Sequence, residues 1–189
     1  MMIKIRYKKP IVSKQRKKKK NIKLDIERMP GRGPANHQNF QVNYLFGLND
    51  LCKKYLSKDK IVLELGSNEG VSTSLFSFYC KKVVAVDRIK KTQIEKIVLK
   101  NKNIEFHHMN FYDFAKIYTS RKYDLVYIDG DHEFQSVSKD IRTFLPKIKK
   151  DGYISGHDFW IKGVEDAVNL IFPKRKIEIF SDSSWLIKI

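Results

Sequence analysis

The stretch Lys60-Ile-Val-Leu-Glu-Leu-Gly-Ser-Asn-Glu-Gly70 decides the fold. Residues 61–65 are apolar and β-branched enough to form a strand that is buried on both faces. Gly66 and Gly70 then permit a tight turn and a close approach of the backbone to a ligand. A second apolar run ends at Asp87, 21 residues beyond Gly66. Because an acidic residue at about this distance binds ribose hydroxyls in βαβ units, the two signals together predict a nucleoside-binding site.

The spacing of the glycines indicates which kind of nucleoside ligand to expect. Dinucleotide-binding folds use G-x-G-x-x-G to bring backbone against a pyrophosphate. Here the pattern is Glu64-x-Gly66-x-x-x-Gly70, with Ser67 and Asn68 inside the turn. It resembles motif I of the class I S-adenosylmethionine (SAM) methyltransferases, in which the turn holds the methionine part of the cofactor. Taken alone, the pattern also fits an ordinary strand-to-helix turn with two glycines.

Later motifs make the resemblance more specific. They run in order as Ile128-Asp-Gly-Asp-His-Glu-Phe134, Val137-x-x-Asp140, Lys150-Asp-Gly152, Gly156-His-Asp-Phe159 and Gly163-Val-x-x-Ala-Val168. This ordered set is similar to the small O-methyltransferase-like proteins grouped as methyltransferase family 24, and the likeness covers about residues 40–189. The chain departs from the family at Phe134, where tyrosine is usual, and at Asn110, where an acid is usual.

The resemblance implies SAM as cofactor, S-adenosylhomocysteine (SAH) as product, and a set of cofactor-binding residues. Gly66 and Gly70 are expected around the methionine part, Asp87 on the ribose and Asn110 on the adenine. The implied set is Glu64, Gly66, Ser67, Asn68, Gly70, Asp87, Arg88, Asn110, Phe111 and Asp129.

Polar residues follow the fourth and fifth expected strands. Ligands of an open parallel sheet lie beyond the carboxyl ends of its strands, so Asp129, Asp131, His132, His157 and Asp158 should converge on one crevice. We expect catalytic roles for Asp129, His132, His157 and Asp158. A neutral imidazole, His132 or His157, is suited to deprotonate a hydroxyl near neutral pH. Asp131 fits loop hydrogen bonding and catalysis equally well.

A divalent metal is an alternative way to activate the acceptor. Asp129, His157 and Asp158 could bind a cation that lowers the pKa of a hydroxyl group. A histidine stands where many metal-dependent relatives have a carboxylate or an amide, which weakens the case for magnesium. We therefore favour acid–base catalysis by protein side chains without a metal.

Strands and helices alternate from Lys60 onward, which predicts an α/β fold with right-handed crossovers. Strands are expected at 61–65, 82–87, 103–109, 123–129 and 151–157, and helices at 39–55, 71–80, 90–100, 111–118, 133–148 and after Gly163. Residues 176–180 and 185–189 are separated by too few residues for a helical crossover, so they must pair antiparallel. The prediction is a Rossmann-like, seven-stranded, mostly parallel sheet with an antiparallel C-terminal hairpin strand and helices on both faces. Asp140 and Asp166 are expected on solvated helix surfaces.

Positive charge is concentrated at the N-terminus. The net charge is +17, and eleven cations precede the first acid, Asp25, which leaves +6 for the remainder. Such a block repels itself, so we assign residues 1–28 to a flexible basic arm and residues 29–189 to the methyltransferase domain. The Lys4–Lys23 stretch could attract nucleic acid or another polyanion, or serve only as a solubilising tail.

Several function classes are disfavoured by composition. Cys52 and Cys80 give neither a disulfide framework nor a C-x-x-C zinc motif. No segment has the length of a membrane span and no signal-peptide core is present, so a cytoplasmic location is expected. The leading hypothesis is O-methylation of a small-molecule hydroxyl, on a sugar or sugar-containing metabolite. The alternatives are a nucleic-acid (ribose) methyltransferase and a non-catalytic polyanion-binding module that uses the arm.

Deletion of the arm through Lys23 should leave the folding and the SAM affinity of the domain unchanged, because this segment is densely charged and lacks an apolar periodicity that could pack on a core. Thermal melting of the truncated and full-length proteins measures this. A large drop in Tm on truncation would show that the arm packs on the domain.

Overall fold

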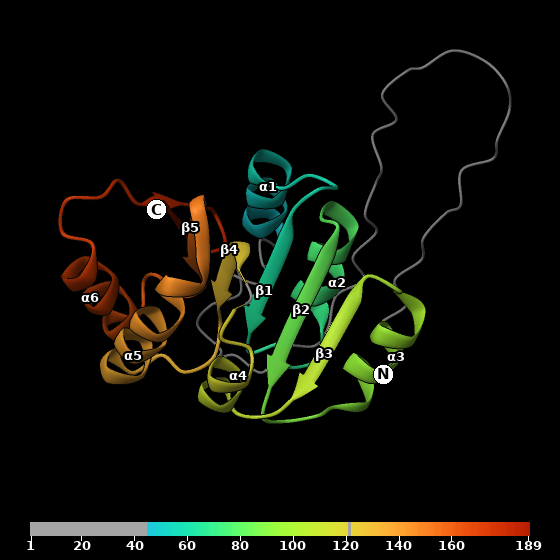
Figure 1. The fold of residues 1–189 in the computed structure, drawn as a ribbon. Coiled ribbons are helices and arrows are strands. Elements are labelled where there is room, and N and C mark those ends of the chain that lie inside the picture. The colour runs from blue at the N-terminus through green and yellow to red at the C-terminus, as the bar shows by residue number, and fades with distance from the viewer. Residues whose placement is uncertain (1–44, 121) are drawn as a thin grey trace, which may run out of the picture. The chain divides into compact units, whose positions relative to one another are not determined.

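The structure, a computed structural model, describes residues 45–120 and 122–189. These residues form a seven-stranded sheet in the order β3-β2-β1-β4-β5-β7-β6 (Figure 1). Strands β1 to β5 are parallel, and β7 pairs antiparallel with both β5 and β6. The predicted fold class and the antiparallel C-terminal hairpin are confirmed. The predicted arm, residues 1–28, lies outside the described residues.

The bounds of the elements agree with most of the predicted ones. The strands are β1 (Ile61–Leu65), β2 (Lys82–Asp87), β3 (Ile104–His108), β4 (Tyr123–Ile128), β5 (Ile148–Gly156), β6 (Glu178–Ile179) and β7 (Trp185–Lys188). The helices are α1 (Phe46–Tyr55), α2 (Val71–Tyr79), α3 (Thr92–Lys100), α4 (Phe111–Ile117), α5 (Phe134–Phe144) and α6 (Lys162–Ile171). Within the described part of the chain, no helix combines the length and the apolar character that a membrane crossing requires.

Both faces of the sheet are covered by helices (Figure 1). On one face, Leu63 and Val84 belong to a buried cluster with Phe114 of α4 and Ile141 of α5. On the other face, the ring of Phe76 in α2 packs edge-on against Tyr127 of β4, with 5.1 Å between the ring centroids. Because alternate residues of a strand point to opposite faces, strands packed in this way must be apolar at nearly every position. The continuous apolar runs of the sequence follow from this arrangement.

The helix predicted at 133–148 is too long. Helix α5 ends at Phe144, a 3₁₀ turn spans Leu145–Lys147, and β5 begins at Ile148 rather than at residue 151. Pro146 has no N–H to continue the helical hydrogen bonds, so the chain tightens and leaves the helix there. The helix predicted at 39–55 begins at Phe46 in the described residues, and residues 39–44 lie outside them.

The prediction that Asp140 is solvated is also wrong. Asp140 is only 3% exposed. One of its carboxylate oxygens accepts a hydrogen bond of 2.8 Å from the hydroxyl of Tyr112. Asp166 lies on α6 beside Lys162, with which it forms an ion pair. The sequence pattern places Asp140 correctly on α5, but it could not show that α4 would cover that part of the helix.

The C-terminal hairpin holds the first turn of α1. Asp182, in the turn between β6 and β7, accepts hydrogen bonds from the backbone N–H of Leu48 (2.6 Å) and of Ser184 (3.0 Å). A Cβ atom on Gly47 would lie 2.2 Å from Oδ1 of Asp182. Asp182 therefore caps a helix that is distant in sequence, and only glycine at position 47 leaves room for it.

Replacement of Asp182 with alanine should lower the free energy of unfolding by about 2–4 kcal/mol, because two buried N–H groups lose a charged acceptor. Urea denaturation measures the change. Asp182→Asn is the matched control, since its amide oxygen can still accept one of the two bonds, and it should be less destabilising. A loss of under about 0.5 kcal/mol in the alanine variant, typical of surface changes, would contradict the capping role.

Candidate active site

The carboxyl ends of five parallel strands are held in register at one edge of the sheet. The N–H of Gly66 donates to the carbonyl of Val86 at 2.9 Å, and that of Asp129 donates to the carbonyl of Leu65 at 2.8 Å. The N–H of His157 donates to the carbonyl of Ile128 at 3.1 Å. The polar residues that follow β1, β4 and β5 are therefore brought together, as the sequence predicts.

The loop between β1 and α2 passes very close to the tip of β4. Gly66 has φ +92°, and a Cβ atom at this position would lie 2.1 Å from the carbonyl oxygen of Asp129. Gly70 has φ +85° and precedes the first turn of α2. Both positions require glycine, because other residues rarely adopt these backbone angles. The first N–H groups of α2 consequently face the space above the sheet edge.

Asp87 connects this loop to the loop after β2. One carboxylate oxygen accepts a 2.8 Å bond from the N–H of Asn68, and the other accepts a 2.8 Å bond from the N–H of Ile89. A carboxylate oxygen has more than one lone-pair site, so both oxygens can still accept from the hydroxyls of a ribose. Asp87 thus fixes the backbone of both loops, and its contact with a ribose stays a prediction.

Glu64 lies beneath the loop rather than in the open. It is fully buried, and its two carboxylate oxygens accept hydrogen bonds from the hydroxyls of Ser72 and Thr73 in the first turn of α2. Burial raises the pKa of Glu64 to about 8, and the charges of Asp129 and Asp87 add to the effect, although the two hydroxyls oppose it. These hydrogen bonds hold the start of α2 against β1, so Glu64 supports the loop between them. A direct contact of Glu64 with the cofactor stays a prediction.

The start of α4 lies beside the loop that follows β4. Asn110 caps α4, its side-chain oxygen accepting a 2.8 Å bond from the N–H of Tyr112. The ring of Phe111 lies against Gly130, where a Cβ atom would come within 2.8 Å of it. Arg88 is exposed, and its carbonyl oxygen lies 3.0 Å from Nε2 of His108. Contact of Asn110 with an adenine stays a prediction.

Asp158 joins the two histidines of the site. Its Oδ2 lies 2.9 Å from Nε2 of His132, and its Oδ1 lies 3.2 Å from Nδ1 of His157. Asp158 has φ +57°, a left-handed conformation that is uncommon for a residue with a side chain. The side chain of His157 is 10% exposed and that of His132 is 44% exposed. One carboxylate thus orients a buried and an accessible imidazole, and its backbone carries strain of the kind found at functional sites.

The electrostatics of the site assign a charge to each group. Burial alone would lower the pKa of His157, but the hydrogen bond to Asp158 and the charges of Asp129 and Asp158 raise it to about 9. The hydrogen bond to Asp158 likewise raises the pKa of His132. Burial raises the pKa of Asp129 to about 6, against the opposing charge of His157. At neutral pH Asp129 is therefore ionised and His157 is an imidazolium, which disfavours the predicted neutral His157 base.

Asp131 has a structural role in the same loop. Its Oδ1 accepts bonds from the N–H groups of His132 (2.7 Å) and Glu133 (3.2 Å), and its Oδ2 accepts a 2.9 Å bond from Ser136. These contacts are typical of an aspartate that stabilises a turn before a helix. They fix the backbone on which His132 is carried.

Three residues are arranged so that they could hold a divalent cation. Asp129, His132 and Asp158 can each offer one ligand atom, and these atoms lie within 4.8 Å of one another. The predicted metal set contained His157 instead of His132. Two carboxylates and one imidazole are a suitable donor set for divalent transition metals. The sequence alone could not identify His132 as a member of this set, because the position of the His132 side chain depends on how the loop after β4 folds back.

Sequence reasoning missed Asp182 as a residue near this site. Its charge contributes to raising the pKa of both Asp129 and His157, after the effects of burial and nearer partners. An aspartate in a short serine-rich turn is an ordinary turn residue. Nothing local in the sequence therefore distinguishes it.

Comparison with known proteins identifies the domain. A family model described as "Methyltransferase domain" matches residues 63–159. An uncharacterized protein, R132 of Acanthamoeba polyphaga mimivirus, is 29% identical over 158 residues, which cover 74% of this chain and 69% of the viral protein.

Solved structures with the same fold include proteins described as methyltransferases. SMU.1697c of Streptococcus mutans, in complex with SAH, has a TM-score of 0.61 and 15% identity, covering 77% of this chain and 97% of that one. CalS11, described as a TDP-rhamnose 3'-O-methyltransferase of calicheamicin biosynthesis, has a TM-score of 0.64 and 10% identity, covering 78% and 79%. SMU.776, with SAH, has a TM-score of 0.62 and 16% identity over 78% of this chain, which spans only 50% of that protein. At these identities the likeness shows the fold.

Replacement of Asp87 with alanine should weaken SAH binding by about 2–3 kcal/mol, because a pair of charge-assisted hydrogen bonds is lost. Isothermal titration calorimetry measures the affinity. Asp87→Asn is the control, since it keeps an acceptor for a loop N–H and should bind SAH better than the alanine variant. Unchanged affinity in Asp87→Ala would remove this residue from the cofactor site.

Proposed function

Because the chain belongs to methyltransferase family 24, we propose that it transfers the methyl group of SAM to a hydroxyl oxygen of a small molecule, a sugar or sugar-containing metabolite. SAM is the methyl donor of this family, and when bound it supplies an electrophilic methyl group. The protein must then hold the donor, align the acceptor and take up the proton of the hydroxyl. CalS11 is described as acting on a sugar, which supports sugars as the first acceptors to test.

The residues at the sheet edge fit SAM. Glu64, Asp87 and Asp129 interact electrostatically across the loop after β1, since the charges of the two aspartates raise the pKa of Glu64. Because the pKa of Glu64 is about 8, this group is largely protonated at neutral pH, and Asp87 and Asp129 carry the negative charge that a ligand with a sulfonium and an ammonium group would balance. Ser67 in the same loop has a buried hydroxyl with no hydrogen-bond partner among the described residues. Such a group is suited to bond a polar atom of a ligand.

The observation that carries the proposal is the position of the Asp129 carboxylate. The backbone of Asp129, at the tip of β4, lies directly beside Gly66 of the cofactor loop. A carboxylate oxygen of Asp129 lies within 4.8 Å of side-chain ligand atoms of His132 and Asp158, and His157 belongs to the same electrostatic cluster. As the bond from sulfur to the methyl carbon breaks and the bond from oxygen to carbon forms, the hydroxyl proton passes to Asp129. The positive charge of His157 keeps Asp129 ionised. Alignment of the acceptor can itself supply about 7–11 kcal/mol.

A metal-assisted version of the same reaction is the second candidate, and the arrangement of Asp129, His132 and Asp158 favours it. A divalent cation held by these three residues would lower the pKa of the acceptor hydroxyl. His132 would then have to give up its hydrogen bond to Asp158, which is possible because its side chain is 44% exposed.

Asp129→Asn should lower turnover by about 10²–10⁴ and weaken SAH binding much less, because the variant loses a proton acceptor but keeps an amide oxygen at a position that is also predicted to contact the cofactor. SAH release measured against a panel of sugars and nucleotide sugars first identifies the acceptor. Asp113→Asn, on the exposed surface of α4, is the control. Near-wild-type turnover in Asp129→Asn would exclude this base.

The pH profile of kcat/KM distinguishes the two possible bases. If ionised Asp129 accepts the proton, activity should rise as pH increases through about 6. A neutral His157 base would instead require pH values above about 9. Loss of wild-type activity with a chelator, restored by added divalent metal, would assign Asp129, His132 and Asp158 to metal binding. A rise centred near pH 9 would contradict the Asp129 assignment.

A further inference from the structure

A basic groove runs between α4 and the end of α5, and Asn110, the residue predicted to contact the adenine of the cofactor, lines it. Its volume is about 880 Å³, and it extends from Asn110 at the start of α4 to Lys147 in the turn before β5. This volume is within the range of about 300–1,000 Å³ that is usual for ligand sites. Four lysines line it, namely Lys116, Lys122, Lys139 and Lys147.

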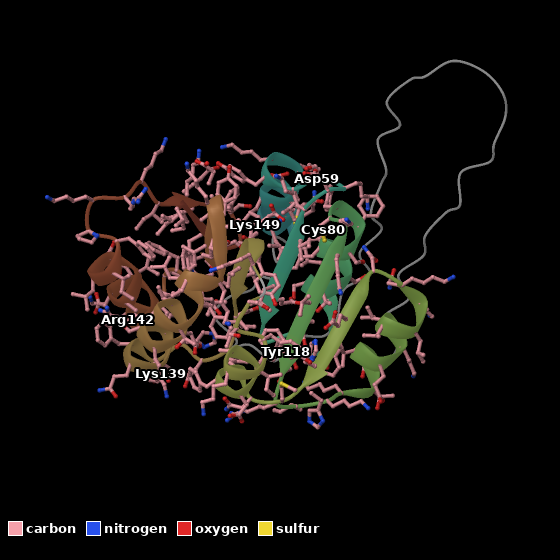
Figure 2. All side chains as sticks on the ribbon, viewed as in Figure 1. Asp59, Cys80, Tyr118, Lys139, Arg142 and Lys149 are labelled. Atoms are coloured by element: carbon pink, nitrogen blue, oxygen red, sulfur yellow. The ribbon has the colours of Figure 1, made fainter. Side chains whose placement is uncertain are left out.

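The positive charge of the groove is poorly balanced by acids. Asp113 is the acidic residue of the lining, and it lies 3.7 Å from Nζ of Lys116. Lys122 donates to the carbonyl oxygen of Pro146. The charge of Lys139 acts on the carboxylate of Asp140, but neither lysine forms a close ion pair with another described residue. Figure 2 shows Lys139 and Arg142 on the same helix, α5, and both are exposed. The groove therefore keeps a positive potential that a bound anion would neutralise.

Lys147 removes the negative potential that the end of α4 would otherwise contribute. The residue is only 7% exposed, and its Nζ donates to the carbonyls of Ala115 (2.9 Å) and Tyr118 (3.0 Å) at the C-terminus of α4. Helix C-termini carry partial negative charge. Burial, followed by the nearby charge of Lys122, lowers the pKa of Lys147. An anion beside these two ammonium groups would relieve their repulsion.

The groove offers charge but little surface for stacking. Tyr112 is its one aromatic lining residue, and Nζ of Lys139 lies 3.9 Å from the centre of that ring. The hydroxyl of Tyr112 is fixed by Asp140 at 2.8 Å. Recognition of bases usually needs a free aromatic face. The groove is thus suited to phosphates rather than to bases.

We propose that this groove binds the phosphodiester backbone of a nucleic acid. Its lysines come from α4, from the residue just before β4, from α5 and from the turn before β5, so they form an extended surface that can contact successive phosphates. The charge of +6 that remains beyond the N-terminal block of eleven cations adds long-range attraction for such a partner. Phosphate contacts of this kind position a nucleic acid without reading its sequence.

The test is fluorescence anisotropy of the full-length protein with fluorescein-labelled poly(U), as a function of salt. Lys116, Lys122 and Lys139 are replaced with alanine together, whereas Lys147 is left in place because it supports α4. If the three lysines contact phosphates, affinity should fall about tenfold and the log–log salt slope should decrease by about 2, at roughly 0.7 for each contact. The Lys→Arg triple variant should retain binding.

The matched control replaces Lys96, Lys100 and Lys102, which are exposed on or just after α3, with alanine. It removes the same charge from another surface and should have a much smaller effect. Thermal melting checks that both triple variants are folded. Absence of poly(U) binding by the wild type, equal losses in both triple variants, or no loss in the groove variant would each overturn the proposal. Equally effective displacement of poly(U) by polyglutamate would assign the groove to anionic partners in general and also overturn it.

Discussion

The close approach of Gly66 to the carbonyl oxygen of Asp129 is the constraint on which the site depends. A Cβ atom at position 66 would lie 2.1 Å from that oxygen, so no side chain can be accommodated there. The contact lets the tips of β1 and β4 lie side by side while the loops that follow them turn apart. The loop after β1 then leads into α2 with its free N–H groups, and the loop after β4 carries Asp129 and His132. The donor and acceptor halves of the site are thus adjacent because of one glycine.

Charge is distributed in the site so that each half has a distinct character. The cofactor half has the carboxylates of Glu64, Asp87 and Asp129, and burial is the main reason why the pKa of Glu64 rises to about 8. In the acceptor half, Asp158 bonds His132 and His157 and keeps both imidazoles more basic than usual. Because a pKa of about 8 leaves Glu64 largely protonated at neutral pH, Asp87 and Asp129 carry the negative charge that suits a cationic donor. The ionised carboxylate of Asp129 is also suited to accept a proton.

Features that depend on local sequence were predictable, whereas features that depend on long-range contacts were not. Alternating apolar runs predicted the parallel sheet, and the position of Asp87 at the end of the second run predicted its place at the sheet edge, because a strand's end is a local property. The burial of Asp140 depends on Tyr112 of a different helix. The charge of His157 depends on three aspartates, including Asp182 from the distant hairpin. The periodicity of apolar residues in the sequence does not predict such contacts, because these groups come together only in the folded chain.

The central claim is that Asp129 faces the methyl group that the domain transfers. A crystal structure of the protein with SAH tests it most directly. The account predicts that the ribose hydroxyls bond Asp87, and that the sulfur lies over Gly66 with its former methyl direction pointing toward the Asp129 carboxylate. SAH bound with its sulfur directed away from Asp129, or bound at a place other than the loop from Gly66 to Gly70, would contradict the account.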